Sequence, residues 1–281
     1  MRVSEFHYRA LWRVGGWHPG AHTGKQTGSG QLFRRLASFL DYPDPRRLDL
    51  RASLTDPERQ YRVRLYEQRA GIKVMALVDW SASMGFREPG TKHQAVADFI
   101  DSLALSAQRT GDAAGVVTCA EHVIGELCLP ATRLGGALRD VARRMRQSPP
   151  RGSDASGLLQ AARWLPSSRS LVFLLSDFHY PVELLRRVLA SLSRHQVVPV
   201  VMWRREEQAP DANGLAVMRD LESGAERLVW MRPEMRSRLA DSQHQRRVRF
   251  LQTLHEFGLR PLHLENGFDA NTITRYFLSH A

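Results

Sequence analysis

Apolar residues in this chain fall into short continuous runs, and the segments between the runs repeat their apolar positions every three to four residues. Such runs, rich in Val, Leu and Ala, are typical of strands buried on both faces of a parallel sheet. They lie at 72–79, 113–120, 170–176 and 197–203. The segments with helical spacing lie at 91–109, 131–147, 152–164, 181–192 and 234–257. This alternation predicts an α/β, Rossmann-like fold, in which a mostly parallel central sheet carries helices on both faces.

Shorter segments complete the expected domain, which spans residues 71–281. Residues 122–130 are the expected hairpin partner of the strand before them, and 226–231 is an expected edge strand. Near the end of the chain, a strand at 260–265 precedes a helix that Asp269 is suited to cap.

Residues 1–70 show no clean period, because aromatic residues are interspersed with glycine. The alternating stretch 61–67 (YRVRLYE) predicts one half-exposed strand in this part. The chain is therefore expected to consist of an irregular N-terminal segment with short strands, 1–70, and the domain that follows it. Whether the segment packs on that domain is left open.

The net charge of +11 raises the question of nucleic-acid binding. Only three of the 40 basic residues are lysines, and the arginines are spread through the predicted helices. A solvated basic surface is therefore the preferred interpretation, and nucleic-acid binding is kept as an alternative.

The expected location is the cytoplasm. No apolar run reaches the ~18 residues that cross a bilayer, and charge and glycine interrupt the first twenty residues too often for a signal peptide. The two cysteines, Cys119 and Cys128, are too few for a disulfide framework, which indicates buried thiols.

Hydroxyl and carboxylate side chains follow the ends of two predicted strands. Asp79, Ser81 and Ser83 come at the end of the first strand, and Asp177 ends the strand at 170–176. A third loop, 152–154, adds Ser153. Side chains at the carboxyl ends of parallel strands project from the edge where open α/β proteins bind ligands. Because all these ligands are oxygens, they predict a site for a hard cation such as Mg²⁺.

The order DWSASM, a Gly-Ser loop and LLSD resembles the metal-ion-dependent adhesion site of von Willebrand factor A domains. The resemblance implies that Mg²⁺, with Mn²⁺ or Ca²⁺ as alternatives, binds a partner protein's acidic side chain. One departure is a serine where the family usually has threonine, which keeps the hydroxyl and loses a methyl group. The implied ligands are Asp79, Ser81, Ser83, Ser153 and Asp177.

More of the chain resembles a bacterial branch of that family, domain of unknown function 58, often encoded beside MoxR-type AAA+ ATPases. The similar stretches lie at 22–33, 44–51, 61–69, 110–120 and 218–231. Leu50 departs from the pattern, because tryptophan is usual there. The resemblance implies a non-enzymatic module that works with such an ATPase in assembly or maturation of another complex.

A metal-dependent phosphohydrolase or phosphotransferase is the alternative from another class. Enzymes of the haloacid dehalogenase type carry a second Asp two residues after the first, where this chain has Ser81, and no lysine follows at a suitable place near Asp177. Trp80, Met84 and His179 are candidates for the partner-binding rim. For Trp80 and Met84, burial beneath the loop is an equal alternative.

Overall fold

A computed structural model describes residues 4–15, 18–28, 32–85, 92–150, 152, 154–203, 214–219, 226–265 and 267–279. The chain divides into two compact units. The larger comprises Met1–Tyr8, Lys73–Arg109 and Ala113–Ala281, and the smaller comprises Arg9–Ile72 and Thr110–Asp112. Residues 4–8 thus belong to the larger unit, unlike the expected division at residue 70. The reason is Phe6, which is buried against the rings of Phe99 and Phe173.

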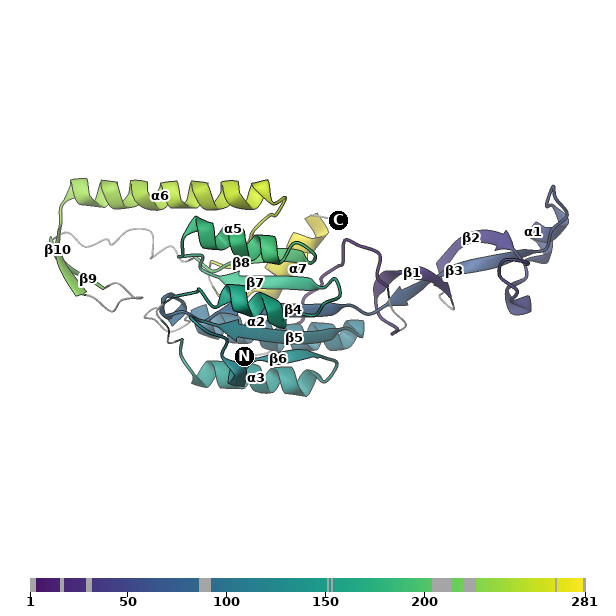
Figure 1. The fold of residues 1–281 in the computed structure, drawn as a ribbon, viewed down its shortest axis with the longest axis horizontal. Helices are drawn as coiled ribbons and strands as arrows, with labels where there is room; N and C mark the ends of the chain where they lie inside the picture. Colours follow the sequence, from purple (N-terminus) through teal and green to yellow (C-terminus); the bar gives the residue numbers. More distant parts are fainter. Residues whose placement is uncertain are drawn as a thin grey trace. The chain divides into compact units, whose positions relative to one another are not determined.

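The larger unit is built on a six-stranded sheet of order β11-β8-β7-β4-β5-β6 (Figure 1). All neighbouring strands are parallel except the pair of β5 and β6. The prediction of a mostly parallel sheet is therefore confirmed. The strands are β4 (Lys73–Asp79), β5 (Ala113–Cys119), β6 (Leu129–Thr132), β7 (Leu171–Ser176), β8 (Gln196–Val201) and β11 (Leu262–His263).

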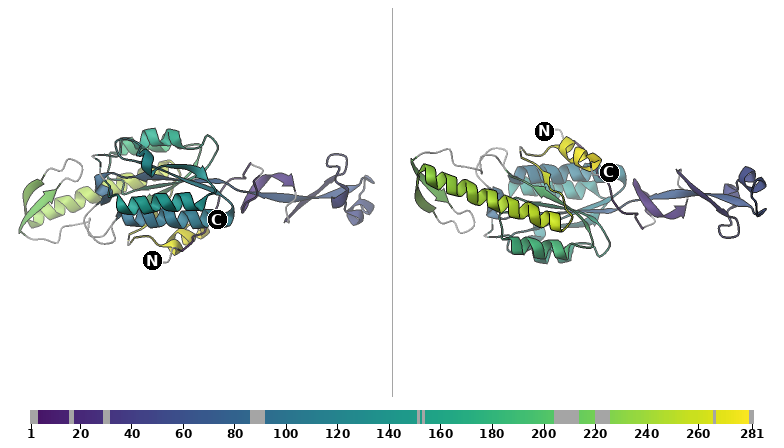
Figure 2. Two further views of the ribbon diagram at one scale, coloured as in Figure 1. Left: turned by 90° about the horizontal axis from the view of Figure 1, so that it is seen from below. Right: turned by 90° about the horizontal axis from the view of Figure 1, so that it is seen from above.

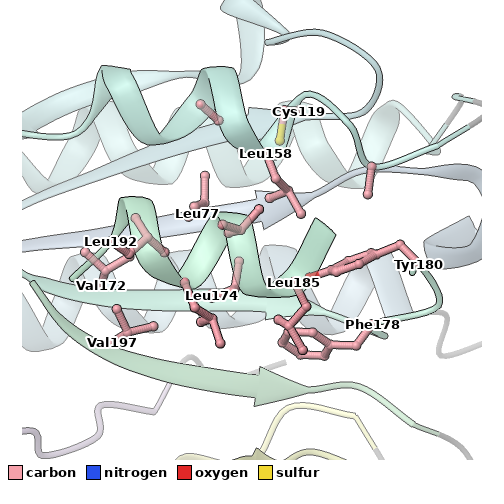
Figure 3. Packing of buried hydrophobic residues seen from close by; sticks show 14 of the residues in the cluster. Leu77, Cys119, Leu158, Val172, Leu174, Phe178, Tyr180, Leu185, Leu192 and Val197 are labelled. Atoms are coloured by element: carbon pink, nitrogen blue, oxygen red, sulfur yellow. The ribbon is translucent and has the colours of Figure 1, made fainter. Parts of the chain in front are cut away.

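Helices cover both faces of this sheet, as predicted (Figures 1 and 2). Successive strand residues point to opposite faces. On one face, Leu77 and Leu174 pack with α4 (Leu158–Ala161), α5 (Val182–Ser191) and the end of α6 (Pro233–Glu256) (Figure 3).

On the other face, Phe173 meets Phe99 of α2 (Lys92–Thr110) and Phe277 of α7 (Ala270–Ser279). Helix α3 (Gly135–Gln147) is joined to α2 by Arg146, whose guanidinium bonds to Asp98 and Asp101. The central strands therefore have no solvent-exposed face, which explains their unbroken apolar sequences.

The structure corrects several predicted boundaries. The 122–130 segment becomes a 3₁₀ turn, η3 (Gly125–Leu127), and the strand starts only at Leu129. The helix predicted at 152–164 is reduced to α4 and a 3₁₀ turn, η4 (Ala162–Trp164). Strand β10 (Glu226–Met231) exists, but it pairs with β9 (Gly214–Arg219) in a separate hairpin rather than at the edge of the main sheet.

The smaller unit is more regular than predicted. Its antiparallel sheet has the order β1-β3-β2. It consists of β1 (His22–Gly28), β2 (Leu32–Ser38) and β3 (Arg62–Ala70), with η1 (Pro45–Arg47) and α1 (Leu50–Leu54) between β2 and β3. The predicted strand at 61–67 corresponds to β3. A small core of Ala37, Val63 and Leu65 holds the sheet.

None of the described helices combines the length and the apolar character needed to span a membrane.

Candidate functional site

Two neighbouring strands bring the predicted carboxylates to the same edge of the sheet. Strands β4 and β7 are parallel, with Val78 opposite Leu175, so Asp79 and Ser176 follow at the same level. The Ser176 hydroxyl donates a hydrogen bond of 2.7 Å to Asp79 Oδ2. Asp177 lies one residue further and, like Asp79, is fully buried.

The loop after β4 links these two carboxylates through its serines. The Ser81 amide donates to Asp79 Oδ1 (3.0 Å), and the Ser81 and Ser83 hydroxyls lie 3.2 Å apart. Ser83 Oγ in turn donates to Asp177 Oδ1 (3.3 Å). Four of the five predicted ligands therefore form one hydrogen-bonded chain, called here the strand-end cluster.

The third predicted loop reaches the same place through its backbone. The Ala82 amide donates to the Gly152 carbonyl (3.1 Å). A side chain at Gly152 would place a Cβ only 2.5 Å from the Cβ of Ala120, so glycine is required for this approach. Ser153 lies outside the described residues, and its role as a ligand stays a prediction.

Lys92, at the start of α2, contributes a contact that the sequence interpretation missed. Its ammonium group donates to Asp177 Oδ2 (2.7 Å) and lies 3.5 Å from the Ser83 carbonyl oxygen, and both charged side chains are almost fully buried. No lysine follows Asp177 in the sequence, but the fold brings Lys92, which lies 85 residues earlier, to this carboxylate. The available signal was the rarity of lysine in a chain whose other basic residues are almost all arginine.

The three predicted partner-binding residues differ in their exposure to solvent. Trp80 and Met84 are 2% and 0% exposed, so neither forms a rim, and burial beneath the loop is the correct alternative. His179 is the exposed member: its side chain is 35% accessible, and its Nδ1 lies 3.4 Å from Asp177 Oδ2. Trp203, which was not predicted, donates from Nε1 to the Asp177 carbonyl (2.8 Å).

The two carboxylates carry opposite pKa shifts. Burial, and then the charge of Asp177, raises the pKa of Asp79 to about 6 against the hydrogen bonds from Ser176 and Ser81. Burial also opposes ionisation of Asp177, but the hydrogen bond and charge of His179 and the charge of Lys92 hold its pKa below the ordinary value. The charged form is therefore favoured at Asp177 and disfavoured at Asp79.

The donor set suits a hard cation. It consists of two carboxylates and two hydroxyls, which are oxygen ligands. The described residues contain no group of three or more His, Cys, Asp or Glu that could hold a metal ion, so the hydroxyls would have to complete the site. The Tyr180 hydroxyl is buried and meets no partner within hydrogen-bonding geometry in the described structure. Burial, and then the charge of Asp79, raises its pKa well above the ordinary value.

Two features limit that fit. Lys92 already neutralises Asp177, and a second cation at the same oxygen would be repelled by the ammonium group. In addition, the four described ligands are at most 5% exposed, so a partner cannot reach them directly in this conformation.

Comparisons with known proteins agree with the sequence resemblance at the level of the family. A family model described as "Protein of unknown function DUF58" matches residues 44–249. An uncharacterised protein in the moxR 3′ region of Paracoccus denitrificans is 35% identical over 103 residues, which are 36% of this chain and 96% of that protein.

Two solved structures are distantly similar. One is an aerotolerance-related membrane protein from Bacteroides fragilis NCTC 9343, with multiple mutations to serines (TM-score 0.45, 15% identity, 74% of this chain and 98% of that one). The other is the conserved hypothetical protein BatB from Bacteroides thetaiotaomicron (TM-score 0.40, 15% identity, 67% and 99%).

Proposed function

The chain belongs to the DUF58 family of proteins of unknown function, and we propose that it is a non-enzymatic, von Willebrand factor A-like protein-binding module. Its strand-end cluster holds Mg²⁺, with Ser153 as a fifth ligand, and the bound cation receives an acidic side chain of a partner protein. The partner system is a MoxR-type AAA+ ATPase that acts in assembly or maturation of another complex.

The observation that carries this proposal is the hydrogen-bonded chain that runs from Asp79 through the Ser81 amide, and from the Ser81 hydroxyl through the Ser83 hydroxyl to Asp177. Mg²⁺ bound there would supply an open coordination position for a carboxylate from outside the chain. The protein's own part is orientation: the Ser81 amide and the Ser176 hydroxyl fix both oxygens of Asp79. This preorganisation lowers the entropy lost when the ligands close around a cation.

Lys92 has to leave Asp177 Oδ2 before that oxygen can bind a divalent cation. Its ammonium group therefore acts as a tethered competitor, which neutralises Asp177 while the site is empty of metal. The same contact explains how a buried carboxylate is tolerated without a bound ion.

The MoxR setting rests on the relative from Paracoccus denitrificans, whose printed name describes only its position in the moxR 3′ region. The region of 103 matched residues covers nearly all of that relative, which supports a shared role for the common part.

Phosphoryl transfer remains the second candidate, because the Lys92–Asp177 pair supplies the lysine that the sequence interpretation found missing. A nucleophilic Asp79 is disfavoured by its burial and by the hydrogen bonds at both its oxygens. Turnover of a generic phosphoester such as p-nitrophenyl phosphate, lost in Asp79→Asn, would favour this enzyme class over the binding module.

The proposed function is tested by Mg²⁺-dependent thermal stabilisation. The wild type should be stabilised by millimolar Mg²⁺, Asp79→Asn should lose the response, and the surface control Asp140→Asn should keep it. An identical response of the wild type and Asp79→Asn would show that the ligands are assigned wrongly.

A further inference from the structure

A polar cleft runs between α5 and α6, on the same side of the larger unit as the exposed edge of His179. Its larger cavity, of about 700 Å³, reaches from Glu256 to Tyr180. A smaller cavity of about 140 Å³ is walled by Phe178, His179 and Trp203. The two cavities share Gln243 and Arg246 in their linings, and together they are called here the α5–α6 cleft.

Positive charge dominates this cleft. Four arginines and two glutamates line it. Arg186 is paired with Glu256 (2.5 Å), and Arg247 lies over the Trp203 ring at 4.7 Å from its centre. The guanidinium groups of Arg246 and Arg249 are exposed and make no ion pair with a described residue. Two unneutralised cations one helical turn apart therefore face the cleft.

The cleft and the strand-end cluster are physically joined. His179 lines the smaller cavity and its Nδ1 lies 3.4 Å from Asp177, and Trp203 lines the same cavity and donates to the Asp177 carbonyl. The cluster itself is almost closed to solvent. A partner therefore meets His179 and the arginines before it meets the buried oxygens.

We infer that the α5–α6 cleft docks an acidic segment of the partner protein. Arg246 and Arg249 pair with its carboxylates, and the smaller cavity receives one side chain next to His179. The inference rests on the proposed function for its setting, since it supplies the approach by which an acidic partner group reaches the cation. Charge complementarity of this kind raises the association rate and selects acidic partners.

An acidic protein segment fits this cleft better than a nucleic acid. Single-stranded nucleic acids bind through aromatic faces on which bases stack, whereas the Trp203 face is covered by Arg247.

The test uses the full chain and a fluorescein-labelled oligoglutamate peptide, with binding followed by fluorescence anisotropy in Mg²⁺ and in EDTA. The variant is the double reversal Arg246→Glu with Arg249→Glu. The matched control is Arg139→Glu with Arg143→Glu on α3, which changes the net charge equally, also on a helix surface. The cleft reversal should weaken peptide binding by at least about tenfold relative to the α3 reversal, because close charge pairs carry this much coupling.

Equal affinities of the two double reversals would overturn the inference, and so would a wild type that does not bind the peptide. Stronger displacement by a single-stranded oligonucleotide than by unlabelled peptide would also overturn it, in favour of nucleic acid. If binding needs Arg246 and Arg249 but is the same in Mg²⁺ and EDTA, the cleft assignment stands and the cation-dependent function fails. If binding needs Mg²⁺ but not these arginines, the cation-dependent function stands and the cleft assignment fails.

Discussion

Two buried aspartates, one in each unit, show different ways of holding a charge inside this protein. Asp112, in the smaller unit, accepts short hydrogen bonds from the Ile72 amide (2.8 Å) and the Thr110 hydroxyl (2.6 Å), and pairs with His22 at 2.9 Å. Asp177, in the larger unit, has one short contact, to Lys92, while its bonds to the Ser83 hydroxyl and the His179 amide are 3.3 and 3.2 Å.

This difference in bonding distinguishes a structural carboxylate, Asp112, from a carboxylate that can exchange its partners, Asp177. Asp112 is fixed partly by a backbone amide, which cannot move away without unfolding the segment between β3 and β4. Asp177 also accepts from a backbone amide, that of His179, but at the longer distance of 3.2 Å, and its contacts with Lys92 and the Ser83 hydroxyl come from side chains that can rotate away and be replaced by a cation. A short bond from the backbone indicates a structural crosslink, whereas a longer backbone bond leaves the carboxylate to be held by side chains and allows it to change its ligand.

The largest expected effect is that of Asp112→Ala. It leaves the Ile72 amide and His22 without their buried partner, which should lower the free energy of unfolding by about 3–4 kcal/mol. Urea denaturation followed by circular dichroism measures the loss. The Mg²⁺-induced stabilisation should stay at the wild-type size, and its disappearance in this variant would contradict a purely structural role.

Lys92→Met should show most clearly that Asp177 can exchange its partner, whereas Asp112 is structural. In EDTA, the variant leaves Asp177 charged and buried without its cation, which should lower the free energy of unfolding by about 3 kcal/mol. In Mg²⁺, the loss should be recovered, and the affinity for Mg²⁺ should rise on the order of tenfold or more because a nearby positive charge is removed. Isothermal titration calorimetry measures the affinity, and an unchanged value would exclude competition at Asp177.

A pH titration of the metal-free protein tests the charge state of the strand-end cluster. The pKa of Asp79 is raised to about 6, so the folded state binds a proton that the unfolded state has already released. Between about pH 4 and pH 6, this group should therefore lower the free energy of unfolding by about 2 kcal/mol as the pH rises.

The contribution of Asp177 to the free energy of unfolding depends on pH in the opposite direction. Because its pKa is lowered in the folded state, Asp177 contributes stability that is lost only as the pH falls below about 4. Denaturation curves of the wild type and Asp79→Asn in EDTA measure the difference between the two proteins. A wild-type slope equal to that of Asp79→Asn between pH 4 and pH 6 would show that Asp79 is already ionised in the folded state.

The smallest expected effect is that of Ser176→Ala. It removes the hydrogen bond to Asp79 Oδ2 and the one that Ser176 Oγ accepts from the Phe178 amide. The expected loss of stability is about 1–2 kcal/mol, with weaker Mg²⁺ binding because Asp79 is less well oriented. A variant with wild-type Mg²⁺ affinity would show that Ser176 only supports the fold.

The central sheet and the meeting of Asp79, Ser81, Ser83 and Asp177 could be predicted from the sequence. Both follow from local rules, since unbroken apolar runs form buried parallel strands and residues after their carboxyl ends meet at one edge. The residue order along one loop was sufficient to place Asp79, Ser81 and Ser83 together, whereas the hydrogen bonds of the two serines were not predicted.

The contact of Lys92 and the burial of Trp80 could not be predicted in this way. Lys92 lies 85 residues before its partner, and its position depends on how α2 packs against the sheet. The amphipathic pattern at 152–164 predicted a longer helix than the one turn that forms, α4. The pairing of β9 with β10 in a separate hairpin has no local signal in the sequence. These features are decided by tertiary packing, which overrides local propensity.

The most direct test of the account is calorimetric titration of Mg²⁺ into the wild type, Asp79→Asn and Asp112→Asn. The account predicts saturable binding to one site in the wild type and in Asp112→Asn, and at least about tenfold weaker binding in Asp79→Asn, because a charged ligand is replaced by a neutral one. Equal binding by all three proteins, or no binding by the wild type, would contradict the assignment of the strand-end cluster as a cation site.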